Sequence, residues 1–429
     1  MTTVTHQAVQ AKFRWLVLLV SIGFFMQALD TTIVNTAIPA MAIQLNENPL
    51  QMHGVIIAYV LSVAAFIPLS GWLADRFGIR NVYLAAMIIF SLASLGCGLS
   101  QSLDQLLFCR VLQGIGGALL MPVGRLALLK IIPRTQFLSA MSLMSLAGLI
   151  GPLMGPTLGG WLVEFTTWHW IFLINLPMGV LGIIMTLKIM PNHKESTVKS
   201  FDFSGFILLM VAMIGLSLGI ENIAMPQYSG GVSISLLLIG SMAALGYAYH
   251  AHIHQNALFH GRLFRYKIYS IGILGNFFAR LGSNAIPFIL PLMLQVAFGF
   301  EPFVTGLLMI PMVLGSLFSK PIIRPIIQRV GYRRFLLSNT VLVGVCIASF
   351  ALMTAATPLW IKVLHLFIFG TLNSLQFVGM NTLTLKDLPQ HDASSGNSFL
   401  SMIMMLSMSI GVALAGTLIN VFEQYFATA

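Results

Sequence analysis

The stretch GWLADRFGIRNVYLA, residues 71–85, places one aspartate, two arginines and a glycine between two long apolar runs. A related stretch, IIRPIIQRVGYRRFLL, lies at 322–337. Alignment of the two stretches matches Arg76 with Arg329, Gly78 with Gly331, and Arg80 with Arg333. Each stretch follows the second apolar run of a block of six. Internal symmetry of this kind is typical of membrane proteins that consist of two helical bundles.

The composition indicates the class of protein. Of the 429 residues, 57% are hydrophobic and only 8% are charged, whereas a soluble domain carries about 25% charged residues. Apolar runs of roughly 20 residues, the length of a membrane-spanning helix, recur along the whole chain. The sequence therefore predicts an all-α, polytopic membrane protein.

Thirteen apolar runs are predicted to span the membrane. They cover residues 15–40, 52–73, 81–101, 104–127, 138–164, 169–188, 203–223, 232–252, 268–296, 303–322, 335–355, 359–383 and 398–422. Because this number is odd, the two ends of the chain are expected on opposite faces of the membrane.

The basic residues orient these spans. All but three of the 22 lysines and arginines lie in the N-terminal segment, in loops after even-numbered spans, or at the helix ends beside them; the exceptions are Arg110, Arg280 and Lys362. Cytoplasmic loops are enriched in Lys and Arg, so the N-terminus is predicted to be cytoplasmic. The net charge of +10 is then a signal of topology and does not indicate a nucleic-acid partner.

Four motifs carry a resemblance to a known family. GWLADRFGIR resembles the signature between helices 2 and 3 of the major facilitator superfamily, and RVLQGIGGALLMPVGR (110–125) resembles its helix 4 motif. GLIGPLMGPTLGGWL (148–162) resembles the helix 5 motif of its antiporters. LDTTIVNTAIPAM together with WHWIFLINLPMG (168–179) resembles the fourteen-helix drug:proton antiporter family.

This resemblance implies the major facilitator fold, with two six-helix bundles and two inserted helices. The expected divisions are a first bundle at 1–200, an inserted pair at 201–262 and a second bundle at 263–429. Because the family has fourteen spans and this chain has thirteen, the sixth helix of the second bundle is expected to be absent. Gln328 stands where the first half has Asp75, so the second copy of the loop lacks its acidic residue.

Asp30 is the only charged residue in the first span. It lies about 22 Å from the cytoplasmic start of that span, and Arg110 lies at a similar depth in the fourth span. A buried Asp–Arg pair lowers the cost of either charge in a membrane, so the two are predicted to pair, with Gln113 completing the hydrogen bonds. The resemblance implies that this pair couples transport to protons; a static ion pair that fixes two helices is the alternative.

Arg280 is predicted near the middle of the membrane, about 18 Å into its span. The spans of the second half offer it no acidic partner away from their ends. Together with Asp30 and Arg110 it gives a net intramembrane charge of +1, which favours an anionic or zwitterionic substrate; a structural role is the alternative. The residues predicted to line the substrate cavity are Gln27, Asn35, Gln113, Asn276, Arg280, Asn284, Asn373 and Gln376.

Two motifs are predicted to act in conformational change. The loop after the second span is interpreted as a conformational latch, in which Gly71 permits close helix approach and Asp75 pairs with arginines or a helix N-terminus in one state; simple loop anchoring is the alternative. The latch residues are Gly71, Asp75, Arg76, Gly78 and Arg80. The helix 5 motif is predicted to bend its helix and to allow tight packing. Its residues are Gly151, Pro152, Gly155, Pro156, Gly159 and Gly160.

The segment HAHIHQNALFH (250–260) has the residue type of a metal site. Its first three histidines are spaced i, i+2, which spreads them around a helix, and no acid or cysteine accompanies them in the sequence. We therefore expect no metal site there. Because no ATP-binding motif and no catalytic dyad at membrane depth is found, no cofactor and no enzymatic activity are expected.

Together with the resemblance, these features predict a monomeric, proton-coupled secondary antiporter. It would export small organic molecules or drugs across the bacterial inner membrane by alternating access, with the substrate, protons and the lipid bilayer as its partners. Two alternatives stay open. One is an exporter of anionic metabolites or of metal–carboxylate chelates such as iron citrate, and the other is a transport-inactive membrane receptor or scaffold.

Overall fold

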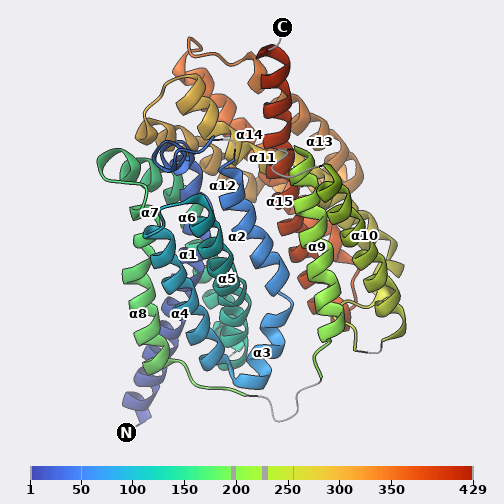
Figure 1. Cartoon of the computed structure of the whole chain (residues 1–429). Coiled ribbons are helices and arrows are strands. Elements are labelled where there is room, and N and C mark those ends of the chain that lie inside the picture. Colours follow the sequence, from blue (N-terminus) through green and yellow to red (C-terminus); the bar gives the residue numbers. More distant parts are fainter. Residues whose placement is uncertain are drawn as a thin grey trace.

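The computed structural model describes residues 2–49, 51–132, 134–194, 200–224, 230–254 and 256–427, and this part of the chain is helical throughout apart from its connecting segments (Figure 1). The α-helices are α1 (Thr2–Leu45), α2 (His53–Phe66), α3 (Leu69–Phe77), α4 (Ile79–Gly98), α5 (Leu103–Ile131), α6 (Arg134–Phe165), α7 (Trp170–Leu173), α8 (Asn175–Ile189), α9 (Phe203–Ala224), α10 (Gly230–Ile253), α11 (Lys267–Leu292), α12 (Pro302–Val330), α13 (Tyr332–Ser349), α14 (Leu359–Lys386) and α15 (Gln390–Ala427). Three short helical turns join them: η1 (Gly261–Arg265), η2 (Met293–Ala297) and η3 (Phe350–Leu352).

Eleven helices or helix pairs of the described residues are long and apolar enough to cross a membrane, and there are twelve if α2 and α3 form one bent span. All thirteen predicted runs fall on helices. Two of these runs are not among the eleven spans. The run 138–164 lies on α6, several of whose side chains are outside the described residues. The run 52–73 is predicted as one helix, but it is bent by 56° between α2 and α3. Pro68 explains the bend, because proline has no backbone N–H to continue the helical ladder.

We call α1–α8 the first bundle, α9 and α10 the inserted pair, and α11–α15 the second bundle. The largest hydrophobic core lies among the helices of the first bundle and extends onto α11 and α15. A second core joins the inserted pair to α2, α11 and α15. α10 lies beside α9, which in turn lies beside α15, and α1 begins at the opposite end of the molecule from the end of α15 (Figure 1).

One of the contacts between the two bundles is that of α6 with α12. A Cβ atom added at Gly160 would lie 2.8 Å from the carbonyl carbon of Pro302, and one added at Gly306 would lie 2.8 Å from that of Pro156. Real Cβ contacts are not this short, so glycine at both positions allows the two backbones to pack directly against each other.

The internal repeat is present in the backbone. Gly78 ends α3 with φ 90° and ψ 145°, and Gly331 ends α12 with φ 79° and ψ 155°. In both places the next helix starts at the following residue. This region of conformational space is almost restricted to glycine, so the two matched glycines in the sequence correspond to two matched turns.

We expect Gly331→Ala to destabilise the protein by about 1–3 kcal/mol, because alanine at this φ and ψ is strained. Gly344→Ala is the matched control in the neighbouring α13: it is exposed, has no heavy atom within 4 Å of an added Cβ, and has no positive φ. Thermal unfolding in detergent measures both. Equal unfolding temperatures for the two variants would contradict the strained turn.

Candidate functional site

Asp30 and Arg110 form the predicted ion pair inside the first bundle. Arg110 Nη1 donates to Asp30 Oδ2 at 2.6 Å, and both side chains are almost completely buried. Ser102 caps the start of α5 by accepting a hydrogen bond from the backbone N–H of Gln105, which places Arg110 two turns inside the helix. The sequence therefore positions a cation on α5 directly opposite the acid on α1.

Three neutral side chains complete the surroundings of the carboxylate. Gln113 Nε2 donates to Asp30 Oδ1 at 2.7 Å, and Asn175 Nδ2 donates to the same oxygen at 3.2 Å. Both amides also donate to the hydroxyl of Ser94, at 2.6 Å and 3.2 Å. Helices α1, α4, α5 and α8 thus meet around one buried carboxylate. Of these partners, the sequence predicts Gln113.

Arg110 has two further partners on α2. Its Nε donates to the carbonyl oxygen of Val55 at 3.1 Å, and its guanidinium carbon lies 4.2 Å from the centroid of the Tyr59 ring. The close approach depends on Gly114, where an added Cβ would lie 2.6 Å from the carbonyl oxygen of Tyr59. A cation–π contact and charge-assisted hydrogen bonds together replace the water that the guanidinium loses on burial.

A cavity of about 410 Å³ lies between the two bundles. It is lined by residues of α1, α6, α11, α12 and α14, and its polar lining consists of neutral amides and hydroxyls. These polar residues are Thr32, Asn35, Ser283, Asn284, Ser316, Asn373 and Ser374. Apolar side chains such as Met309, Met312 and Phe377 provide most of the remaining wall.

The residues predicted for the cavity occupy different places. Asn35, Asn284 and Asn373 line it, whereas Gln113 is not among its lining residues. Asp30 and Arg110, which are predicted for proton coupling, do not line it either. Gln27 is buried on α1 outside this lining set.

The two remaining amides make contacts within the second bundle. Gln376 faces α13, where it accepts from Asn339 at 2.9 Å and donates to Thr340 at 2.7 Å. Asn276 donates to Thr384 on α14 at 3.0 Å. Neither is among the residues that line the cavity.

Arg280 is buried on α11 beside the cavity. Its guanidinium carbon lies 3.8 Å from the centroid of the Phe377 ring, and Phe377 is part of the cavity wall. Its two hydrogen bonds, to Asn276 and Asn381, are both long, at 3.4 Å. Within the described residues no carboxylate pairs with Arg280, so its charge is balanced only by amide dipoles and an aromatic face.

The predicted latch residues surround the turn between α3 and α4. Asp75 pairs at 3.0 Å with Lys130 at the end of α5, a lysine rather than the expected arginine. The guanidinium of Arg76 lies over the ring of Trp72 at 5.3 Å. An added Cβ at Gly78 would lie 2.8 Å from Asn192 Cγ, so the segment after α8 packs on this turn. Arg80 is partly buried in the first turn of α4.

The expectation for Gly71 is wrong in this structure. Gly71 is exposed, and a Cβ atom added there would have no heavy atom within 4 Å. The glycine therefore does not allow a close helix approach at this position.

The glycines of the helix 5 motif lie on α6 against α1. Added Cβ atoms would lie 2.7 Å from Ala28 Cβ at Gly151, 3.0 Å from Thr32 Cβ at Gly155, and 2.6 Å from Ile33 O at Gly159. Pro152 and Pro156 line the cavity, and Gly160 packs on α12 as described above. The motif thus forms a groove for α1 on one side and the contact between bundles on the other.

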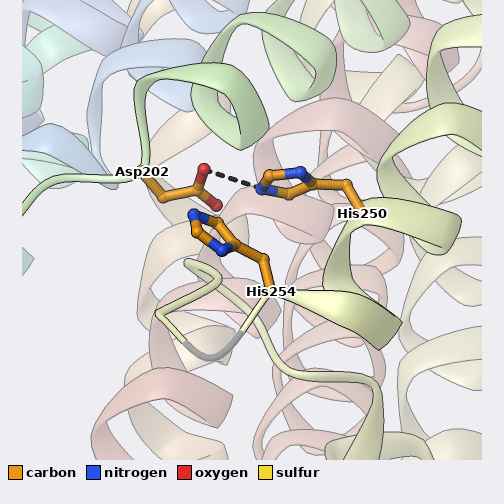
Figure 2. A group of neighbouring side chains, drawn as sticks. All are labelled: Asp202, His250 and His254. Carbon is orange, nitrogen blue, oxygen red and sulfur yellow. Dashed lines mark hydrogen bonds and ion pairs between the residues drawn. The ribbon is translucent and has the colours of Figure 1, made fainter.

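Two clusters of titratable side chains outside this region are not predicted by the sequence analysis. His53 on α2 pairs with Glu221 on α9 at 3.0 Å. Among the described residues, one group has the geometry of a metal site: Asp202, His250 and His254 (Figure 2). The signal for the second was the i, i+4 spacing of His250 and His254, which puts both on one helix face.

Known proteins match this chain along most of its length. A sequence profile described as Major Facilitator Superfamily matches residues 20–412. A protein named "Putative multidrug resistance protein MdtD" from Pectobacterium atrosepticum is 50% identical over 417 residues, which cover 96% of this chain and 89% of that protein. The protein of the same name from Escherichia coli O6:H1 is 51% identical over 411 residues, which cover 95% and 87%.

Solved structures share the fold. The POT family transporter PepTSo superposes with a TM-score of 0.70 at 16% identity, covering 97% of this chain and 92% of that chain. A D-xylose–proton symporter superposes with a TM-score of 0.63 at 14% identity, covering 94% and 88%. At these identities the likeness concerns the arrangement of helices and not the transported compound.

We expect Arg110→Leu to destabilise the protein by about 3–5 kcal/mol, because it leaves the Asp30 carboxylate buried without its cation. The double variant Asp30→Asn, Arg110→Leu removes both charges and is expected to recover most of this loss, since Gln113 and Asn175 can still bond to an amide. Thermal unfolding in detergent measures all three proteins. A double variant no more stable than Arg110→Leu would show that the pair is not what stabilises this region.

Proposed function

The chain belongs to the Major Facilitator Superfamily of membrane transporters, and we propose that it is a proton-coupled antiporter that exports small organic molecules across the bacterial inner membrane by alternating access. The observation that carries this proposal is the buried Asp30–Arg110 pair. Asp30 lies on α1, and Thr32 and Asn35 of the same helix line a cavity between the bundles. The family consists of transporters and not of enzymes.

The proposed coupling rests on the ion pair of Asp30 with Arg110. The guanidinium, 2.6 Å away, balances the charge of a carboxylate that is buried away from water. If a rearrangement of the bundle withdraws Arg110, the carboxylate loses its compensation and takes up a proton. The reverse movement expels the proton, so the position of the guanidinium can control the protonation of Asp30.

Helix α1 is the element proposed to link the proton to the substrate. Asp30 faces the interior of the first bundle, while Thr32 and Asn35 on the same helix face the cavity. A movement of α1 therefore changes the surroundings of the carboxylate and the shape of the cavity together. The contact of α6 with α12 is the proposed point about which the bundles rock.

The cavity chemistry supports a broad range of substrates. Its neutral amides and hydroxyls can form hydrogen bonds in several directions, and Met309 and Met312 can adapt their shape to different apolar groups. The relatives from Pectobacterium atrosepticum and Escherichia coli carry multidrug resistance in their names, which agrees with such a cavity.

We expect Asp30→Asn to abolish drug-linked proton movement, because an amide cannot take up and release a proton as a carboxylate does. The assay loads proteoliposomes with a pH-sensitive dye and adds ethidium. Asp104→Asn is the matched control, because Asp104 is exposed in the first turn of α5. Unchanged proton movement in Asp30→Asn would remove Asp30 from the mechanism. No ethidium-linked proton movement in the wild type would favour the anion exporter or the inactive receptor instead.

Arg280 favours a second candidate function, the export of anionic metabolites or metal–carboxylate chelates. Within the part of the chain that the structure describes, its guanidinium forms two long hydrogen bonds and is stacked on Phe377, a residue of the cavity wall. A rotation of that ring would bring the cation to the cavity, where a carboxylate could form the short hydrogen bonds that the two asparagines do not provide.

We expect Arg280→Ala to abolish the protection of overexpressing cells against an iron citrate load, if the substrate is anionic. Arg280→Lys is expected to retain part of it, because lysine keeps the charge but not the planar fork. The amount of each variant in the membrane fraction, measured by immunoblot, serves as the control for folding and insertion. Full protection against iron citrate by Arg280→Ala would refute the anionic candidate.

A further inference from the structure

We propose that Asp202, His250 and His254 bind a divalent transition-metal ion of the zinc type. The three side chains lie where α9 begins and α10 ends, at the end of the molecule at which α1 begins (Figures 1 and 2). Their site is separate from the Asp30–Arg110 pair and from the cavity between the bundles. With the N-terminus inside, as the basic residues predict, it would face the cytoplasm.

The positions of the ligand atoms fit one ion. His250 and His254 are one helical turn apart, and their ring centroids lie 4.8 Å from each other. His250 Nε2 lies 2.8 Å from Asp202 Oδ1, and one ligand atom of each of the three residues lies within 4.8 Å of the others. Bonds of about 2.0–2.1 Å in a tetrahedron put ligand atoms roughly 3.4 Å apart. Small side-chain rotations are therefore enough to bring all three to an ion.

The carboxylate is already held in place. The Asp202 side chain is 1% exposed, and it accepts hydrogen bonds from the backbone N–H groups of Gly205 at 2.8 Å and Leu258 at 3.3 Å. Such outer contacts orient a metal ligand before the ion arrives. Gly205 is also the residue that leaves room for it, since an added Cβ would lie 2.8 Å from Asp202 Cγ.

The ligand set selects the class of ion. Two imidazoles and one carboxylate suit Zn²⁺, Co²⁺ or Ni²⁺, whereas Mg²⁺ and Ca²⁺ prefer oxygen ligands throughout. The exposed His254 gives the ion a path from solvent, and three protein ligands leave a fourth position for water. A hydrogen-bonded helix cap, formed by Asp202 and His250 alone, is the competing explanation and does not need His254.

An ion here would join three segments of the chain. Asp202 precedes α9, the histidines end α10, and Leu258 lies in the connection to α11. The carbonyl oxygen of Leu258 also accepts from Ser395 on α15 at 3.2 Å. Occupancy would therefore stiffen the contact between the inserted pair and the second bundle.

The test uses the purified full chain in detergent, without a polyhistidine tag. We expect Co²⁺ to produce visible ligand-field absorption at one ion per chain, and Zn²⁺ to displace it. His254→Ala is expected to weaken this binding at least about tenfold. His252→Ala is the matched control, because His252 is also exposed, lies in the last turn of α10 two residues before His254, and is outside the group.

Thermal unfolding separates binding from folding. His254→Ala is expected to unfold at the wild-type temperature without metal, because its side chain forms no hydrogen bond within the described residues, and Zn²⁺ is expected to raise only the unfolding temperature of wild type and His252→Ala. Equal loss of Co²⁺ binding in His252→Ala and His254→Ala, or no absorption with wild type, would overturn the site. Either result would leave the helix cap as the role of Asp202.

Discussion

A charged side chain inside a bilayer needs an opposite charge or hydrogen-bond partners from the protein, and the first bundle supplies both around Asp30. Asp30 is balanced by Arg110 on α5, and its other oxygen accepts from the amides of Gln113, also on α5, and Asn175 on α8. Both amides also donate to Ser94 on α4. Because Arg110 also bonds to the backbone of α2, five helices are tied to one carboxylate. A change at this carboxylate therefore affects the packing of these five helices, which is what the proposed proton coupling requires.

The second bundle meets the same requirement differently. Where the first bundle has an ion pair, the second has neutral networks such as Asn339 with Gln376. One of its buried cations, Arg280, has an aromatic ring and two distant amides as partners. The two halves share the turn at Gly78 and Gly331 but differ in the chemistry of their interiors. The repeated backbone therefore does not require the two halves to have the same function. Proton exchange is proposed for the first half and substrate selection for the cavity wall of the second.

Sequence reasoning succeeded where a single physical quantity decides the answer. Hydropathy and length located the helices, depth along two spans paired Asp30 with Arg110, and matching loops identified Gly78 and Gly331. It failed where the answer depends on contacts between distant segments. Asn175 is neutral, so a search for membrane charges passes over it, although it bonds to Asp30. His250 and His254 were read as i, i+2 neighbours of His252, and Asp202, 48 residues before His250, could not be assigned to them without the packing of α9 on α10. The bend at Pro68 had a signal in the sequence that the length of the apolar run concealed.

The glycines of α6 give the proposed coupling a mechanical basis. Gly151, Gly155 and Gly159 bring the backbone of α6 directly against α1, and Ala28, Thr32 and Ile33 of α1 pack on them. Because these three positions carry no side chain, α6 places no bulky group there in the path of the proposed shift of α1. On one face of α1 this shift alters the distance from Asp30 to Arg110, and on the other it moves Thr32 and Asn35 in the cavity wall. A motif that marks antiporters by resemblance thus has a physical reason to accompany a buried acid on the helix that it contacts.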